Sequence, residues 1–392
     1  MVANGANSDS EPNSSRRGFL KSAGLTATVT AGLGGCLGGG GSGGSGSTDS
    51  NGTTVGTAGD KLADKITFYS TGGSWARKMD EALLKPFQEE TGVTVNLQTY
   101  GNPSTMLSKI KAGQADVDAM LMTDPPLYQG IVDDIWAPLR TKNIPNIDRL
   151  RTLKPSEVPY DQGEEIHHVP NTYGAYGLVY NTNEVSSEPK KWEDIYNSNL
   201  KGNLSLSQFT SSVVGTAALD LGYDINEFAS DDAKVEDVWN RVKKQHEHSY
   251  QWWDSATTAQ QLYTNNSALA GNFWVGRTRV LNNENDVPVK YTLPEDGAVG
   301  YASVWAVNSN IDDPKRYTCE RLLNYVLADE PSRRLAEIIS YAQANEISNP
   351  PESYKTIPDN QHPDRIKLWD QEVFSNNQKE WSQKFQQIAR SN

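Results

Sequence analysis

The sequence predicts an α/β protein with two lobes and a strand that crosses between them. Strand-like and helix-like segments alternate from Lys65 to Thr123, which is typical of a mainly parallel sheet covered by helices. The chain has 392 residues, more than one domain usually holds. Near its middle, the stretch Tyr173–Tyr180 is rich in Tyr and Gly. Because glycine lets other groups approach a strand closely, we expect this stretch to be the hinge strand.

The first lobe begins with three predicted strands separated by two helices. Met79, Leu83, Leu84 and Phe87 recur at helical spacing, and Gly92 would end that helix. The other predicted elements are the strands Lys65–Ser70, Val93–Leu97 and Val117–Met122 and the helix Ser104–Gly113.

Ligands bind such sheets at loops beyond the carboxyl ends of the strands. Here the two loops are Ser70–Trp75 and Thr123–Pro125. The backbone N–H groups of the Gly-Gly-Ser sequence in the first loop could bind an anion at a helix start. A tight turn between strand and helix explains the same sequence equally well. No Gly-Lys-Ser/Thr follows, so nucleotide binding has no support. The candidate binding residues in these loops are Thr71, Gly72, Ser74, Trp75, Thr123 and Asp124.

Composition excludes several other classes of protein. The net charge of −13 and the absence of a basic patch argue against nucleic acid as a partner. Two distant cysteines, Cys36 and Cys319, make no disulfide framework, and Cys319 is expected in the core.

No Gly-x-Ser-x-Gly or His-Glu-x-x-His occurs. His246 and His248 are two apart, which directs them to different sides of a helix. We therefore expect no catalytic residue, no cofactor and no metal.

The N-terminal sequence resembles an export signal. Ser14-Ser15-Arg16-Arg17-Gly18-Phe19-Leu20-Lys21 resembles a twin-arginine signal, and residues 22–35 are small and uncharged. Leu33-Gly34-Gly35-Cys36 resembles a lipobox, in which Cys36 is lipidated. We therefore expect residues 1–35 to be a lipoprotein signal peptide, residues 36–61 a Gly/Ser/Thr-rich tether, and the body to lie lipid-anchored at the extracellular face of the membrane. An ordinary cleaved signal with an incidental cysteine is the alternative.

Four short motifs follow one another along the rest of the chain. They are Pro86-Phe87-Gln88-Glu89-Glu90-Thr91-Gly92-Val93-Thr94-Val95, Lys191-Trp192-Glu193-Asp194-Ile195, Leu200-Lys201-Gly202-Asn203-Leu204 and Trp274-Val275-Gly276. Their order resembles the spermidine/putrescine-binding branch of the ABC-importer solute-binding proteins, and the resemblance covers about Lys65 to Asn392. It implies a two-lobed type II periplasmic-binding-protein fold, with mixed sheets flanked by helices and two crossing hinge strands.

The resemblance also implies the limits of the lobes. It makes Tyr173–Tyr180 the first crossing strand and Val299–Asn308 the second. Lobe 1 would then hold residues 62–171 and 299–345, and lobe 2 residues 172–298 and 346–392.

In that family, aromatic side chains line the cleft between the lobes, and carboxylates pair with the ammonium groups of the ligand. Tyr173 aligns with a cleft aromatic on the first crossing strand, Trp274 with the Trp of Trp-x-Gly, and Tyr301 with an aromatic on the second crossing strand. Trp253 is a further candidate. For each of these aromatics, core packing is the alternative.

The acidic positions of the family are replaced here. Gln208 and Ser211 follow the strand at Leu204–Leu206, and Ser303 stands on the second crossing strand. Asp124 and Asp254 remain as possible counter-charges. Because unpaired, desolvated ammonium groups are costly, the ligand could be polyamine-like or another organic ion. Hydroxyl-rich loops at helix starts equally suit a carboxylate or a phosphonate.

The resemblance implies a monomeric, extracytoplasmic solute-binding protein of an ABC importer and not an enzyme. A small-molecule solute in the cleft would favour the closed form, which the ABC permease in the membrane recognises. The alternative is a secreted hydrolase that acts on an extracellular polymer.

Overall fold

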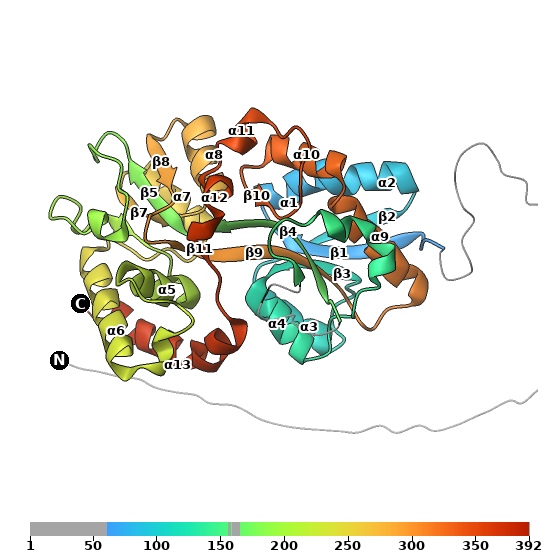
Figure 1. Cartoon of the computed structure of the whole chain (residues 1–392), viewed down its shortest axis with the longest axis horizontal. Coiled ribbons are helices and arrows are strands. Elements are labelled where there is room, and N and C mark those ends of the chain that lie inside the picture. Colours follow the sequence, from blue (N-terminus) through green and yellow to red (C-terminus); the bar gives the residue numbers. More distant parts are fainter. Residues whose placement is uncertain (1–60, 156–157, 159–164, 392) are drawn as a thin grey trace, which may run out of the picture. The chain divides into compact units, whose positions relative to one another are not determined.

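A computed structural model describes residues 61–155, 158 and 165–391, and it shows two β-sheets flanked by helices (Figure 1). The strand order is β10-β4-β9-β3-β1-β2 in the first sheet and β6-β7-β5-β8 in the second. The predicted signal peptide and all of the predicted tether except Lys61 lie outside the described residues. Among the described residues, no helix combines the length and the apolar character that a membrane span needs.

The first sheet is mixed. Its strands are β1 (Lys65–Thr71), β2 (Thr94–Tyr100), β3 (Ala119–Thr123), β4 (His168–Ala175), β9 (Ala298–Val307) and β10 (Ala342–Gln343). β1, β2 and β3 run parallel, as the alternating segments predict, whereas β9, β4 and β10 add antiparallel pairs. The expectation of a mainly parallel sheet is therefore right for the first three strands alone.

Helical periodicity explains the first helical stretch. α1 (Ser74–Met79), the π-helical turn η1 (Asp80–Leu84) and α2 (Lys85–Thr91) follow one another without a break. Met79, Leu83 and Phe87 are buried, as their spacing predicts, and Gly92 ends the stretch with a φ of 73°. The other helices of eight or more residues around the first sheet are α3 (Pro103–Lys111), α4 (Asp124–Val132), α9 (Asp313–Val326) and α10 (Asp329–Ile338). Cys319 is buried in α9.

The second sheet contains β5 (Gly177–Asn181), β6 (Leu204–Ser205), β7 (Ala270–Phe273) and β8 (Val289–Thr292). Its helices are α5 (Thr210–Asp220), α6 (Asp232–His248), α7 (Ala256–Thr264), α8 (Val275–Asn285) and α13 (Gln371–Ala389). A Cβ atom on Gly271 of β7 would lie 1.8 Å from the carbonyl oxygen of Ser205. Only glycine fits there, because the neighbouring strand is too close for a side chain.

The remaining elements are short. They are η2 (Thr141–Asn143), η3 (Pro145–Arg149), η5 (Trp192–Ile195), η6 (Phe228–Ser230), α11 (Glu352–Lys355), α12 (Pro358–Gln361), η7 (Pro363–Arg365) and β11 (Ile366–Lys367).

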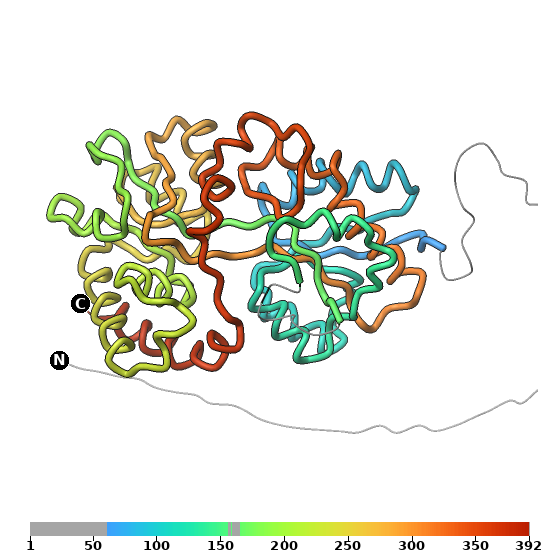
Figure 2. The backbone as a smooth tube through the Cα atoms, in the orientation of Figure 1, coloured from blue at the N-terminus to red at the C-terminus, as the bar shows by residue number. Residues whose placement is uncertain are grey.

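Two crossing strands connect the sheets, as predicted. β4 belongs to the first sheet and β5 to the second, with Tyr176 alone between them. β9 pairs antiparallel with β4 along most of its length, from His168 opposite Ala306 to Ala175 opposite Gly300. A third passage runs from α12 through β11, which pairs with the start of β9, to α13 beside the second sheet; Figure 2 shows it in red. The predicted limits of the lobes stay a prediction.

Tyrosine side chains approach the glycines of the first crossing strand closely, as expected for glycines within a strand. A Cβ on Gly174 would lie 2.7 Å from the hydroxyl oxygen of Tyr301, and one on Gly177 would lie 2.4 Å from the ring of Tyr291. The strand can therefore cross between the sheets against bulky tyrosines only because these two positions lack side chains.

Candidate functional site

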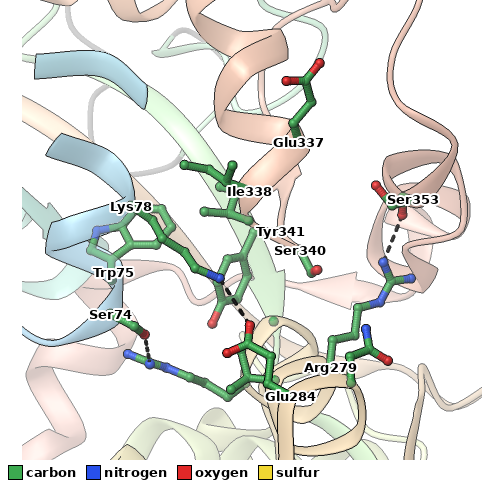
Figure 3. A pocket seen from close by; sticks show the side chains of 15 residues that line it. Ser74, Trp75, Lys78, Arg279, Glu284, Glu337, Ile338, Ser340, Tyr341 and Ser353 are labelled. Carbon is green, nitrogen blue, oxygen red and sulfur yellow. Dashed lines mark hydrogen bonds and ion pairs between the residues drawn. The ribbon is translucent and has the colours of Figure 1, made fainter. Parts of the chain in front are cut away.

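A cavity of about 150 Å³ lies at the crossing strands. Its wall combines the ends of β1 and β3, the strands β4 and β9, and the start of α8 from beside the second sheet. Figure 3 shows a second cavity, which has a volume of about 240 Å³. It shares Trp75, Arg277 and Tyr341 with the first. The residues that line the first cavity are Thr71, Trp75, Leu121, Met122, Thr123, Thr172, Trp274, Arg277, Tyr301, Ser303 and Tyr341.

Sheet topology brings the hydroxyl groups of the first cavity together. Thr71 and Thr123 are the last residues of the parallel strands β1 and β3. Ser303 of β9 stands opposite Thr123 on one side and Thr172 on the other. The hydroxyls of Thr71, Thr123 and Ser303 have no hydrogen-bond partner within the part of the chain that the structure describes. They are therefore free to bind a solute.

Aromatic rings separate the first cavity from the core of the second sheet. Tyr176 packs 5.7 Å from the ring of Trp274, 5.8 Å from that of Tyr301 and 6.2 Å from that of Trp253, measured between ring centres. Trp253 is fully buried, and its indole N–H donates to the carbonyl of Asn272 at 3.0 Å. Trp253 thus supports the wall from behind, whereas Trp274 and Tyr301 reach the cavity.

Arg277 connects α8 to the loop after β1. Its Nη1 donates to the hydroxyl oxygen of Ser74. Beside this contact, the Nζ of Lys78 lies 3.7 Å from a carboxylate oxygen of Glu284, and Figure 3 shows these two side chains pointing toward one another. Burial raises the pKa of Tyr341 to about 12, and the nearby positive charge of Arg277 partly opposes this rise. The second cavity is thus bridged by polar contacts between α1 and α8.

Two carboxylic acids lie near the first cavity but outside its wall. Asp124 is 3% exposed and accepts a hydrogen bond from the backbone N–H of Ala302 at 3.0 Å. Asp359 is fully buried and accepts one from the N–H of Ala175 at 2.8 Å. Burial raises the pKa of each acid to about 7, against the usual 3.8.

Half of the predicted binding residues line the two cavities. Thr71, Trp75, Thr123, Trp274, Tyr301 and Ser303 are in the wall of the first cavity, Ser74 is in the wall of the second, and Gly72 adjoins Thr71.

Besides Gly72, six predicted residues lie outside both walls. Tyr173, Trp253 and Asp124 are buried. Gln208 is exposed, and so is Asp254, whose carboxylate accepts a hydrogen bond from Thr258 at 2.7 Å. The backbone carbonyl of Ser211 accepts one from the indole of Trp369 at 3.2 Å. The ligand-binding role of all the predicted residues stays a prediction.

The sequence analysis missed Arg277, Tyr341 and Thr172. Arg277 directly follows the Trp-x-Gly motif and lies in the first turn of α8, just after β7, so its place was a usable signal. Thr172 lies one residue before the predicted hinge stretch. Tyr341 follows α10 in a segment that carries no motif, and only the fold brings it to the cavity.

Comparison with known proteins decides the family. The model of the bacterial extracellular solute-binding proteins matches residues 82–362. The chain belongs to this family. The predicted family is thereby confirmed, and this is a family of solute-binding transport proteins, not of enzymes.

Individual relatives are distant in sequence. The chain is 22% identical to the spermidine/putrescine-binding periplasmic protein 1 of Haemophilus influenzae over 74% of this chain and 82% of that one. It is 19% identical to the gamma-aminobutyric acid-binding protein of Pseudomonas aeruginosa, over 74% and 80%. The solved structure of the spermidine/putrescine transporter substrate-binding protein PotD from Streptococcus pneumoniae matches 84% of this chain and 100% of that one, at 20% identity and a TM-score of 0.71. The predicted two-lobed type II fold is thereby confirmed.

Proposed function

We propose that this protein captures a small polar solute between its lobes and delivers it to an ABC permease. The observation that carries the proposal is the first cavity, whose wall joins strand ends of one sheet to α8 beside the other. A solute there touches both lobes at once and thus favours the closed form. Relatives named for spermidine, putrescine and gamma-aminobutyric acid support a small organic ion as the solute.

We further propose export through the twin-arginine signal and anchoring of a monomer at the extracellular face through Cys36. The support is the order of the motifs: paired arginines, an uncharged stretch, Leu33-Gly34-Gly35-Cys36, and a Gly/Ser/Thr-rich run before the body. A body held near the membrane in this way can meet both solutes and the permease.

The proposal predicts saturable binding of one solute per chain, together with closure of the lobes. We expect calorimetry on the full chain to find a binder among polyamines, amino acids and organic acids, and small-angle scattering to show a smaller radius of gyration with that binder. Trp274→Ala, which removes an aromatic wall, should weaken binding about tenfold. Tyr250→Ala is the control, because Tyr250 is exposed and lines neither cavity. A scattering profile that stays the same with every solute would contradict the proposal.

A further inference from the structure

We infer that Arg277 recognises an anionic group, so that the solute of this chain is a small organic carboxylate, free or as part of an amino acid, and not a polyamine. This inference rests on the proposed function and names the chemical class of its solute.

The charges of the wall favour an anion. Among the residues that line the first cavity, Arg277 is the one charged side chain, and none is Asp or Glu. A diamine there would meet a guanidinium and no carboxylate. Desolvated charges that lack a partner are strongly unfavourable, and like charges add to that cost.

The carboxylates nearby are already engaged. In the second cavity, Glu284 pairs with Lys78, and Glu337 pairs with Arg333. Asp124 and Asp359 are buried and accept backbone hydrogen bonds from the two crossing strands. Each of these four acids therefore has a partner other than Arg277, and no carboxylate of the described residues lies within 4 Å of the nitrogens of Arg277.

The guanidinium of Arg277 keeps donors for a solute. Its Nη1 bonds to Ser74, whereas Nε and Nη2 have no hydrogen-bond partner among residues 61–155, 158 and 165–391. A guanidinium with free N–H groups in a fixed fork matches the two oxygens of a carboxylate.

Further donors surround this fork. The hydroxyl groups of Tyr301 and Tyr341 lie near the charge of Arg277, and both remain protonated because burial raises their pKa values. The hydroxyls of Thr71, Thr123 and Ser303 line the same cavity. These groups can donate to an anion and can also accept from an ammonium group, so the positive charge of Arg277 is what favours the anion.

The apolar part of the wall sets the size of the solute. Leu121, Met122, Trp75 and Trp274 offer carbon surface beside the polar groups. A cavity of about 150 Å³ holds a molecule of roughly the size of benzene. A short carbon chain with a charged end fits these dimensions.

Three four-carbon compounds test the inference: butane-1,4-diamine, 4-aminobutanoate and butanedioate. They share chain length and differ only in whether ammonium or carboxylate groups stand at the ends. Calorimetry on the full chain should find binding of at least one carboxylate and none of the diamine. Arg277→Gln should weaken that binding about 10- to 100-fold, since a hydrogen bond to a charged group is lost. Arg277→Lys should lose less, because it keeps the charge without the fork.

Arg390→Gln is the matched control. It removes the same charge at the exposed end of α13, outside both cavities, and should leave affinity unchanged. Thermal unfolding of each ligand-free variant separates lost binding from lost folding.

Each outcome decides a separate claim. Binding of the diamine, or a carboxylate affinity that Arg277→Gln leaves intact, overturns the inference and leaves the proposed function standing. If none of the three compounds binds, a screen of acids, amino acids and amines decides. An acid whose binding is abolished by Arg277→Gln supports the inference, and binding of an amine overturns it. If no solute binds at all, both the inference and the proposed function are overturned.

Discussion

Asp359 is a fully buried carboxylic acid that joins two of the three passages between the sheets. It stands on α12, in the third passage, and accepts a hydrogen bond from Ala175 at the end of β4. Tyr291 faces its carboxyl group, and Arg279 lies close enough for its positive charge to favour the carboxylate. Burial dominates these effects and raises its pKa to about 7.

Asp359→Asn is therefore expected to reduce the dependence of stability on pH. With a folded-state pKa of about 7 against 3.8, Asp359 stabilises the fold fully below pH 3.8, and this contribution is lost as pH rises through 7. In the wild-type protein, this loss lowers the free energy of unfolding by up to about 4 kcal/mol between pH 3.8 and 7, and the variant should lack this decrease. Urea unfolding at pH 4.5, 6 and 8 measures it. Asp254→Asn, at an exposed carboxylate, is the control, and an unchanged pH slope in Asp359→Asn would contradict the assignment.

Single residues of the cavity differ in how far the sequence could predict them. Thr71 and Thr123 were predictable, because strand ends of a parallel sheet meet at one edge. Asp254 was chosen for its charge, yet it is exposed and bonded to Thr258 at the start of α7. Tyr341 could not be found, because its place depends on how the segment after α10 packs against β4. Local pattern therefore locates strand ends, and long-range packing decides which side chains face the cavity.

Among the elements, the first crossing strand depends on its glycines. Gly177 begins β5 directly after Tyr176, and the ring of Tyr291 on β8 lies against it. The two strands pair with Leu178 opposite Thr292, so the ring has little room to withdraw. A side chain at this position would push the crossing strand away from its neighbour.

Gly177→Ala should therefore destabilise the fold. Its added Cβ would lie 2.4 Å from the Cζ and the hydroxyl oxygen of Tyr291, and overpacking of this kind costs about 1 to 3 kcal/mol. Guanidinium unfolding measures the change. Gly101→Ala is the control, because nothing lies within 4 Å of a Cβ there. Equal stability of the two variants would show that β5 and β8 separate more easily than their pairing suggests.

Element prediction succeeded where periodicity extends over several turns. The stretch from α1 to α2 and the helix α3 follow from apolar spacing and end signals, such as Gly92 after α2. The break at Tyr176 between β4 and β5 was not predicted, because the apolar pattern continues without a change where the chain passes from one sheet to the other. β11 and α12 were missed for a related reason: two to four residues are too few to show a period.

At the scale of the whole molecule, two lobes and two crossing strands followed from motif order, whereas the solute did not. The family resemblance suggested polyamines, and the replaced acidic positions already argued against them. The wall of the first cavity also favours an anionic solute, since Arg277 lies where both lobes contribute residues. Ligand class thus depends on a few side chains that the fold brings together, and the same fold serves different solutes.

The N-terminal motifs lead to the last prediction, which concerns where the molecule resides. In the cell that makes it, the full chain should fractionate with membranes and come off with detergent. Cys36→Ser should release it into the medium, because residues 22–35 are too few and too poor in Leu, Ile and Val to span a bilayer stably without the lipid. Arg16→Lys with Arg17→Lys should keep it inside the cell, since the proposed route of export depends on the paired arginines. Ser47→Ala, in the same Gly/Ser/Thr-rich run, is the control. Membrane retention of Cys36→Ser would show that an uncleaved signal, and not a lipid, holds the protein.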